Sequence, residues 1–520
     1  MKQKRKTGSS LFGRALNRIE IVGNRLPHPI TLFALLTLAI ILISALCAWL
    51  GVSATGELID ANTLELRTQT VTAVSLLSRE GIVYMLTSLI GNFTGFAPLG
   101  VVLVTMLGVG CAEGSGYLSA LLRKATSITP KVILTPVLVF LGVMSNIATD
   151  IGYVILIPVG AALFAAYGRH PLAGLAAAFA GVSGGFSANL MIGALDPLLA
   201  GISTEAAQMV VRDFVVRPTD NWYIMIASTF LIVIIGSLIT DRIVEPRLGS
   251  YRTDHIEQQG RITALSKAET KGLLVATSVL VVMVLALAAA ALPANSLLRN
   301  PVTGSLTNGS PLMDSLIVII AVLFFVPSVV YGRIAGTYKG EKDVGAQLEK
   351  NMSTMGSYIA LIFIAAQFIS FFQYSQLGTI IAINGAELLK ASGLSGPVLM
   401  LLFVLFTALV NLVMGSATAK WTILAPVFIP MFMMVGYSPA LTQVAYRIGD
   451  SCTNLITPLM SYFAMIVVFA KRYDDKTGIG TLISMMLPYS VFFLIGWSLL
   501  LIVWMLLGLP LGPGVSSMLA

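Results

Sequence analysis

Uncharged apolar runs of membrane-spanning length are the feature that most constrains this chain. The first, from Ile30 to Leu50, contains no charged residue and matches the roughly 20 apolar residues that cross a bilayer core. Only 11% of the 520 residues are charged and 56% are hydrophobic, whereas a soluble domain carries roughly 25% charged residues. Most of the chain therefore has lipid as its solvent, and an ordinary soluble enzyme is excluded.

Basic residues gather in clusters beside the apolar runs, and they account for the net charge of +8. Cytoplasmic loops of membrane proteins carry such an excess of Lys and Arg. This pattern predicts a cytoplasmic N-terminus and an outside C-terminus, and it gives no indication of nucleic-acid binding. Counting apolar runs between the clusters predicts an all-α polytopic membrane protein with about nine transmembrane helices, among them a single crossing over 82–112 after an outside loop at 53–80.

Two pairs of apolar arms are each too short to cross a bilayer comfortably. The arms 132–144 and 151–167 flank a polar tip that contains Ser145, Asn146 and Thr149, and the arms 397–414 and 421–435 flank a tip that begins at Gly415. We interpret both as re-entrant helical hairpins. The resulting organisation is a basic cytoplasmic N-terminus (1–29), scaffold helices (30–131), a first hairpin with a broken helix (132–210), scaffold helices with a cytoplasmic loop at 241–271 (211–396), a second hairpin with a broken helix (397–470), and a cytoplasmic loop with the last helix (471–520).

The two hairpin units form an internal repeat. In each unit the hairpin is followed by an interrupted helix, and residues 187–193 resemble residues 452–458. One unit begins inside and the other outside, so the repeats are inverted. Inverted repeats with interrupted helices are typical of secondary transporters.

Polar residues at these breaks are the candidates for chemistry. Asp150, Asp196 and Asp450 lie within apolar surroundings, where a carboxylate is costly and usually faces a cavity or a charged partner. They could carry protons, although Asp450 could instead form a structural ion pair with Arg447. Neutral groups at the same breaks could bind a substrate carboxylate or cap helix ends, and they are Asn189, Ser416, Thr418 and Asn454, with Asn146 and Thr418 as candidate sodium ligands.

Two further residues lie at the second tip. Trp421 could stack on an aromatic substrate or anchor the chain at the membrane interface. Lys420 could attract an anion, or extend its charged end to water. No phosphate-binding G-x-x-x-x-G-K-[ST] motif occurs, so direct drive by ATP is not expected. We expect no cofactor, no structural metal and no enzymatic activity, with transport coupled to an ion gradient.

Several motifs resemble the AbgT family of bacterial p-aminobenzoyl-glutamate transporters and antimetabolite exporters. The matching stretches are Asn92–Gly100, Gly168–Pro171, Ser187–Leu190 through to Asp196, Asp241–Pro246, Gly415–Ala417 with Trp421, Tyr446–Ser451 and Leu487–Tyr489. The resemblance implies homodimers in the bacterial inner membrane, with nine transmembrane helices and two re-entrant hairpins per subunit. It implies functional roles for Asp196, Ser416 or Thr418, Trp421, Pro439, Arg447, Asp450, Asn454 and Pro458.

The resulting hypothesis is a secondary transporter of p-aminobenzoyl-glutamate-type folate catabolites that also exports p-aminobenzoate and sulfonamide antimetabolites with the proton motive force. Asp196 and Asp450 would carry protons, Trp421 would face the aromatic ring, and Arg447 would pair with Asp450 or with the substrate. One alternative is a sodium-coupled dicarboxylate symporter of the same architecture. Another is a channel-like or scaffolding membrane protein in an efflux assembly.

Overall fold

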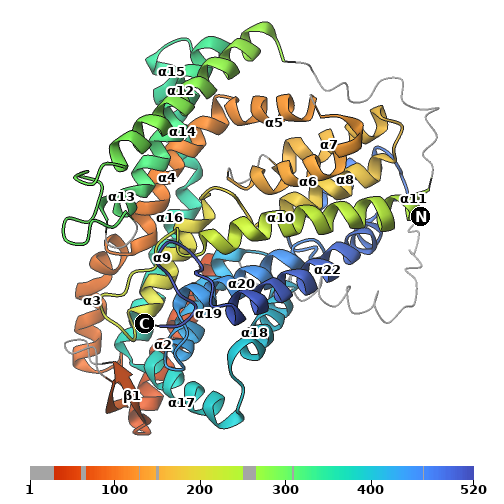
Figure 1. The fold of residues 1–520 in the computed structure, drawn as a ribbon. Helices are drawn as coiled ribbons and strands as arrows, with labels where there is room; N and C mark the ends of the chain where they lie inside the picture. The colour runs from red at the N-terminus through yellow and green to blue at the C-terminus, as the bar shows by residue number, and fades with distance from the viewer. Residues whose placement is uncertain are drawn as a thin grey trace, which may run out of the picture.

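The computed structural model describes residues 29–59, 66–127, 129–147, 152–249, 265–306, 310–460 and 462–519. The basic N-terminus, residues 250–264 of the 241–271 loop, and the hairpin residues Thr149 and Asp150 lie outside these described residues. Nearly all regular structure is helical (Figure 1). The part of the chain before the first repeat forms α2 (Pro29–Trp49), α3 (Arg79–Thr94), α4 (Ala97–Gly114) and α5 (Tyr117–Ser127).

The region between the two repeats is also helical. Its helices are α10 (Trp222–Ile239), α11 (Glu245–Leu248), α12 (Lys267–Ala291), α13 (Pro311–Asp314), α14 (Leu316–Ala335), α15 (Glu341–Thr354), α16 (Gly356–Tyr374) and α17 (Leu377–Ser392).

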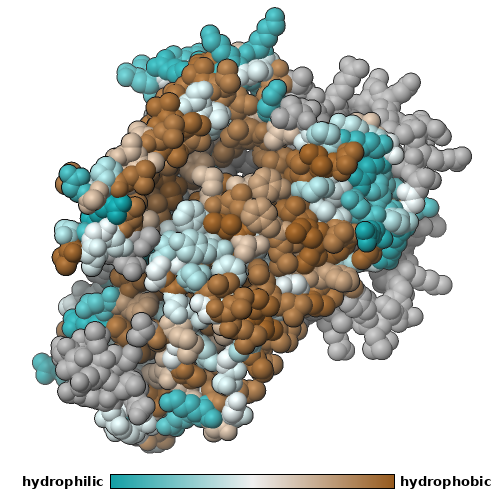
Figure 2. All heavy atoms as spheres, viewed as in Figure 1, coloured by the Kyte–Doolittle hydropathy of each residue, from teal (hydrophilic) through white to brown (hydrophobic). Residues whose placement is uncertain are grey.

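Apolar side chains cover much of the outer surface, as a lipid environment requires. Figure 2 shows hydrophobic residues over α12, α14, α10 and α22 (Ile479–Leu506), where Leu274, Ile234 and Leu499 are among the exposed side chains. Five helices in the described residues are long and apolar enough to cross a membrane, or six if the bent pair formed by α15 and α16 is one span. The chain is therefore a membrane protein, and the count of nine crossings stays a prediction.

The first repeat contains two helical arms that run back along each other. They are α6 (Leu134–Ser145), and a π-helical turn Gly152–Leu156 that continues into α7 (Ile157–Ala166). Glycines allow close packing here, since a Cβ on Gly142 would lie 2.8 Å from the Cα of Gly181. Gly181 lies in the π-helical turn Ala180–Gly184 that follows α8 (Pro171–Phe179), and the chain resumes as α9 (Leu195–Ala207). The segment between them is the predicted first helix break.

The second repeat is built in the same way. Its arms are α18 (Gly396–Asn411) and α19 (Ala417–Met433), and the ring of Phe403 contacts the rings of Phe428 and Phe432. The following helix, α20 (Pro439–Thr453), packs closely on α18, since a Cβ on Gly449 would lie 2.4 Å from the carbonyl oxygen of Val404. After the second break the chain continues as α21 (Phe463–Lys471). Both predicted arm pairs are thus present as doubled-back helices, and their re-entrance from one membrane side stays a prediction.

Two sequence-based expectations are corrected by the structure. The expected crossing over 82–112 is divided into α3 and α4, because Pro98 stands in the first turn of α4 and cannot continue the hydrogen bonding of α3. The segment after α2, expected as a loop, forms two antiparallel strands, β1 (Ser53–Ile59) and β2 (Leu66–Thr72). The alternating Thr residues in 66–72 suit a strand, a pattern that the loop interpretation overlooked.

Candidate functional site

The tips of the two helix pairs line one cavity of about 440 Å³. Asn146 contributes from the first tip, and Gly415 to Thr418 contribute from the second. The two broken helices also reach this cavity, through Leu195 beside Asp196 and through Asn454 after α20. The sequence-based expectation that all four breaks converge is therefore met for the residues that the structure describes.

The wall of this tip cavity combines polar tip residues with aromatic and sulfur-containing side chains. Its aromatic members are Tyr153, Phe186, Tyr358 and Tyr462, and the rings of Tyr153 and Tyr462 stack with centroids 4.7 Å apart. Another cavity, of about 460 Å³, is lined mainly by aliphatic residues of α5, α6, α12 and α14 and includes Ser145 at its edge. Of these two cavities, the tip cavity is therefore the one that combines polar and aromatic side chains in its wall.

The N-terminus of α19 begins at the tip cavity. Ser416 caps this helix, because its Oγ accepts a hydrogen bond of 3.3 Å from the backbone N–H of Ala419. Capping and lining the cavity are thus both roles of Ser416. The start of a long helix carries partial positive charge and favours anions.

Asp196 forms an ion pair that joins the two repeats. Its Oδ1 lies 2.6 Å from Nη2 of Arg447 on α20, and its Oδ2 accepts a hydrogen bond of 2.7 Å from the backbone N–H of Gly193. Arg447 also donates to the carbonyl oxygen of Ser187 at 3.1 Å. Its Nε and Nη1 atoms are buried and have no hydrogen-bond partner among the described residues. The guanidinium therefore keeps unused donor capacity beside the first helix break.

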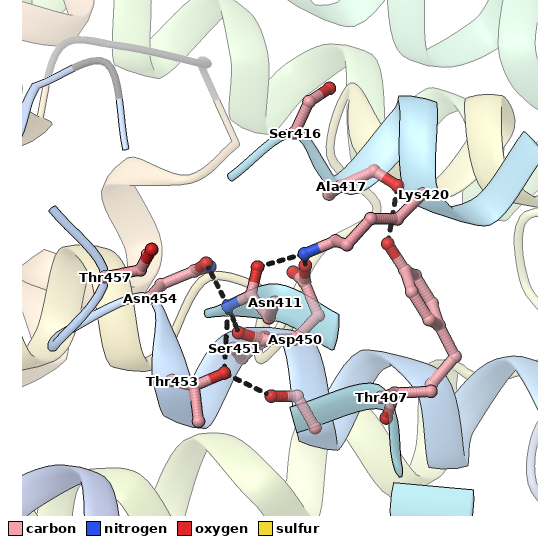
Figure 3. A network of polar contacts seen from close by, with 12 residues as sticks. Thr407, Asn411, Ser416, Ala417, Lys420, Asp450, Ser451, Thr453, Asn454 and Thr457 are labelled. Carbon is pink, nitrogen blue, oxygen red and sulfur yellow. Dashed lines mark hydrogen bonds and ion pairs between the residues drawn. The ribbon is translucent and has the colours of Figure 1, made fainter. Parts of the chain in front are cut away.

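Asp450 pairs with Lys420, and not with Arg447 as one sequence-based expectation had it. Both side chains are at most 1% exposed, so Lys420 does not extend to water. The ammonium of Lys420 also bonds to Oδ1 of Asn411. Figure 3 shows that Asn411 in turn connects to Asn454 and Thr453, with its Nδ2 lying 2.8 Å from Oδ1 of Asn454 and 2.9 Å from Oγ1 of Thr453.

Trp421 lies next to the tip cavity but does not line it. Its side chain is fully buried, its Nε1 donates to Oγ of Ser203 at 3.0 Å, and its ring stacks on Tyr446 with centroids 4.4 Å apart. In this conformation the aromatic contact expected of Trp421 is available instead from the tyrosine and phenylalanine side chains of the cavity wall. Trp421 therefore supports the second tip by packing against α9 and α20.

The other predicted residues divide between the tip cavity and its supporting structure. The Oδ1 atom of Asn146 is buried without a hydrogen-bond partner among the described residues, and Thr418 lines the same cavity. Asn189 stabilises the first break, because its Oδ1 accepts from the backbone N–H of Met191 at 3.1 Å. Ser145 donates to the carbonyl of Gly142. Pro458 lies in the second break and does not line the cavity.

Sequence reasoning missed Asn411, which connects the Lys420–Asp450 pair to the second break. A single amide at the end of an otherwise apolar arm was the available signal. Reasoning from one helix at a time could not show it, because the partners of Asn411 come from α19 and α20.

Doubled-back helices and interrupted helices around one shared cavity define a membrane transporter of small molecules. Comparison with known proteins then identifies the family. The chain matches the model of the AbgT putative transporter family over residues 14–519, and it belongs to that family.

Three relatives show how far the similarity extends. The chain is 37% identical to the p-aminobenzoyl-glutamate transport protein of Escherichia coli K12 over 98% of each chain. The structure of the YdaH transporter of Alcanivorax borkumensis superposes with a TM-score of 0.88 at 46% identity, covering 94% of this chain and 100% of YdaH. The structure of Neisseria gonorrhoeae MtrF, described as illuminating a class of antimetabolite efflux pumps, gives 0.91 at 48% identity and covers 96% and 100%.

Proposed function

We propose that this protein is a secondary transporter of p-aminobenzoyl-glutamate-type folate catabolites that also exports p-aminobenzoate and sulfonamide antimetabolites, driven by protons. The names of its relatives support this substrate class. The observation that carries the proposal is the tip cavity, in which both helix pairs meet. Its volume of about 440 Å³ falls in the range of roughly 300–1,000 Å³ that small-molecule sites occupy.

The wall of the tip cavity matches the chemistry of such a substrate. The aminobenzoyl ring would lie against Tyr153 and Tyr462, and a carboxylate would lie at the N-terminus of α19 beside Ser416 and Thr418. Asn454 would bind a second polar group from the opposite wall. Helix N-termini and hydroxyl groups stabilise carboxylates without adding a fixed charge.

Proton coupling would act through Asp196 and Arg447. While Asp196 is ionised, it holds Arg447 in an ion pair. A proton on Asp196 would remove that partner, and Arg447 would then attract the substrate carboxylate with its unused donors. Substrate and proton would thus bind together, which couples proton entry to uptake of p-aminobenzoyl-glutamate. Proton-driven export of antimetabolites would instead require exchange, in which a proton arriving at Asp196 from outside displaces the outgoing molecule. Asp150 remains a candidate for an additional proton-carrying site, whereas the pairing of Asp450 with Lys420 favours a role for Asp450 in charge balance.

Alternate opening of the two helix pairs would expose the tip cavity first to one side of the membrane and then to the other. We extend to this chain the arrangement that the family resemblance implies, namely a homodimer in the bacterial inner membrane with a cytoplasmic N-terminus and an outside C-terminus. Nine crossings and two re-entrant hairpins would give that orientation.

Uptake of labelled p-aminobenzoyl-glutamate into proteoliposomes tests this function. We expect saturable flux that a proton gradient accelerates, and Asp196→Ala should abolish the proton-coupled part. Asp475→Ala is the matched control, because Asp475 is an exposed acid outside the tip cavity. Undiminished proton-driven flux in the Asp196 variant would remove this residue from the mechanism. Flux that follows a sodium gradient and is inhibited by simple dicarboxylates would favour the symporter alternative, and unsaturable flux would indicate a channel.

A further inference from the structure

Lys420 is a buried cation held entirely by protein oxygen atoms. Its side chain is fully buried, and its ammonium contacts the carboxylate of Asp450 and the amide oxygen of Asn411. Taking an ammonium group out of water costs several kcal/mol, so it must be offset by a counter-charge and by further hydrogen bonds. Asp450 and Asn411 supply both.

The ammonium lies where two helices end. α18 ends at Asn411 and α20 ends at Thr453. Figure 3 shows Asn411 beside the ammonium, with Asn454 and Thr453 hydrogen-bonded to the amide nitrogen of Asn411. The C-terminal end of a helix carries partial negative charge. In transporters with broken helices, such ends and the adjoining unwound chain coordinate cations. The surroundings of Lys420 therefore have the composition of a cation site.

The position of Lys420 in its helix explains how it reaches this place. α19 begins at Ala417, directly after the tip, so Lys420 lies in the first turn. Side chains in a helix tilt toward its N-terminus, which directs Lys420 back to the region between the tip and α20. Its cation is thereby attached to the second helix pair and stays with Asp450.

We propose that Lys420 acts as a tethered cation that occupies the second-repeat cation site and excludes sodium from it. Carboxylate, amide and hydroxyl oxygens are the donors that hard metal cations prefer. With Lys420 present, Oδ1 of Asp450 and Oδ1 of Asn411 contact the ammonium, while Oδ2 of Asp450 is buried without a hydrogen-bond partner among the described residues. The inference deepens the proposed function, since it rests on ion-coupled transport and assigns to Lys420 the choice of proton over sodium.

Sodium binding to purified protein tests the tethered cation without any substrate. Thermal unfolding is measured in detergent with sodium chloride and with choline chloride at equal ionic strength. The native protein should unfold at the same temperature in both salts. Lys420→Ala should be stabilised by sodium chloride in a saturable manner. Lys390→Ala, at an exposed position on α17, should show no sodium effect.

A second variant separates loss of the cation from loss of the fold. Lys420→Ala combined with Asp450→Asn removes both charges, and it should fold in either salt with no sodium effect. If Lys420→Ala alone is folded only in sodium chloride, the proposal is supported. If it responds to neither salt, or if the native protein itself binds sodium, the proposal is overturned.

Transport completes the test. In proteoliposomes, a sodium gradient should accelerate uptake by Lys420→Ala and leave the native protein unaffected. Proton-driven uptake by this variant at the native rate, with no response to sodium, would contradict the role of Lys420. Because sodium binding is measured without substrate, failure of the native protein to carry p-aminobenzoyl-glutamate would count against the proposed function alone.

Discussion

The two repeats each hold a buried acid, but they neutralise it in different ways. Asp196 in the first repeat pairs with Arg447 from the second repeat, whereas Asp450 pairs with Lys420 within the second repeat. The Asp196 pair must therefore break if the repeats move apart, and the Asp450 pair can move as one unit. The difference indicates that Asp196–Arg447 is suited to switching and that Lys420–Asp450 is suited to permanent charge balance.

Exposure supports the same distinction. The side chain of Asp196 is 10% exposed and that of Asp450 is 1% exposed. Arg447 retains buried donors without partners among the described residues, while Lys420 contacts two acceptors at once. A proton or a substrate could therefore compete for the Asp196 pair with little rearrangement.

The largest effect on stability should follow from breaking the Lys420–Asp450 pair. Asp450→Ala leaves the buried ammonium of Lys420 without a counter-charge, and removing one partner of a buried ion pair costs about 3–5 kcal/mol. Thermal unfolding in detergent should show a marked loss of stability. Adding Lys420→Met should restore most of that loss, because the unpaired charge is then absent. An Asp450→Ala variant as stable as the native protein would show that this pair is not needed for charge balance.

A smaller loss of stability but a complete loss of coupling is expected for Asp196→Asn. The amide keeps an acceptor for the backbone of Gly193, so we expect a cost of about 1–3 kcal/mol from the weakened contact with Arg447. Substrate exchange without a gradient should continue, while acceleration by a proton gradient should disappear. If proton-driven uptake persists, the switching role of this pair is wrong.

The sequence predicted most of the helices because runs of apolar residues and basic clusters respond directly to the bilayer. It also marked the four breaks, since Gly, Pro and polar residues are costly in a lipid-facing helix. It did not pair the charges correctly. Asp450 follows Arg447 by one helical turn and suggested that partnership, but only the folded helix pair brings Lys420 alongside. The location of Trp421 behind the tip depended equally on packing between α9, α19 and α20.

Substrate affinity should distinguish the wall of the tip cavity from its support. Tyr153→Leu removes a ring that lines the tip cavity, and loss of an aromatic contact worth about 0.5–1.5 kcal/mol should raise the half-saturating substrate concentration roughly twofold to twelvefold. Trp421→Phe should leave that concentration nearly unchanged, because Trp421 does not line the cavity. Uptake measured over a range of substrate concentrations checks both variants. A larger increase in the half-saturating concentration for Trp421→Phe than for Tyr153→Leu would show that Trp421, and not Tyr153, contacts the substrate ring.

A third buried acid, in the loop before α10, extends the comparison. Burial raises the pKa of Asp220 from 3.8 to about 6, and the hydrogen bond from the backbone of Arg217 opposes this rise. Because the folded protein favours the protonated acid, stability from this group should be present below about pH 4 and be lost as the pH rises through about 6. Asp220→Asn should flatten this dependence in thermal unfolding measured between pH 4 and 7. If the pH dependence of stability is the same in this variant as in the native protein, other titrating groups cause it.

The position of bound substrate tests the central claim most directly. A structure determined with p-aminobenzoyl-glutamate should show the ligand between Asn146 and Ser416, with its ring beside Tyr153 and a carboxylate at the start of α19. Ligand found instead in the aliphatic cavity between α5 and α14, or on the lipid-facing surface, would contradict a shared site at the two tips.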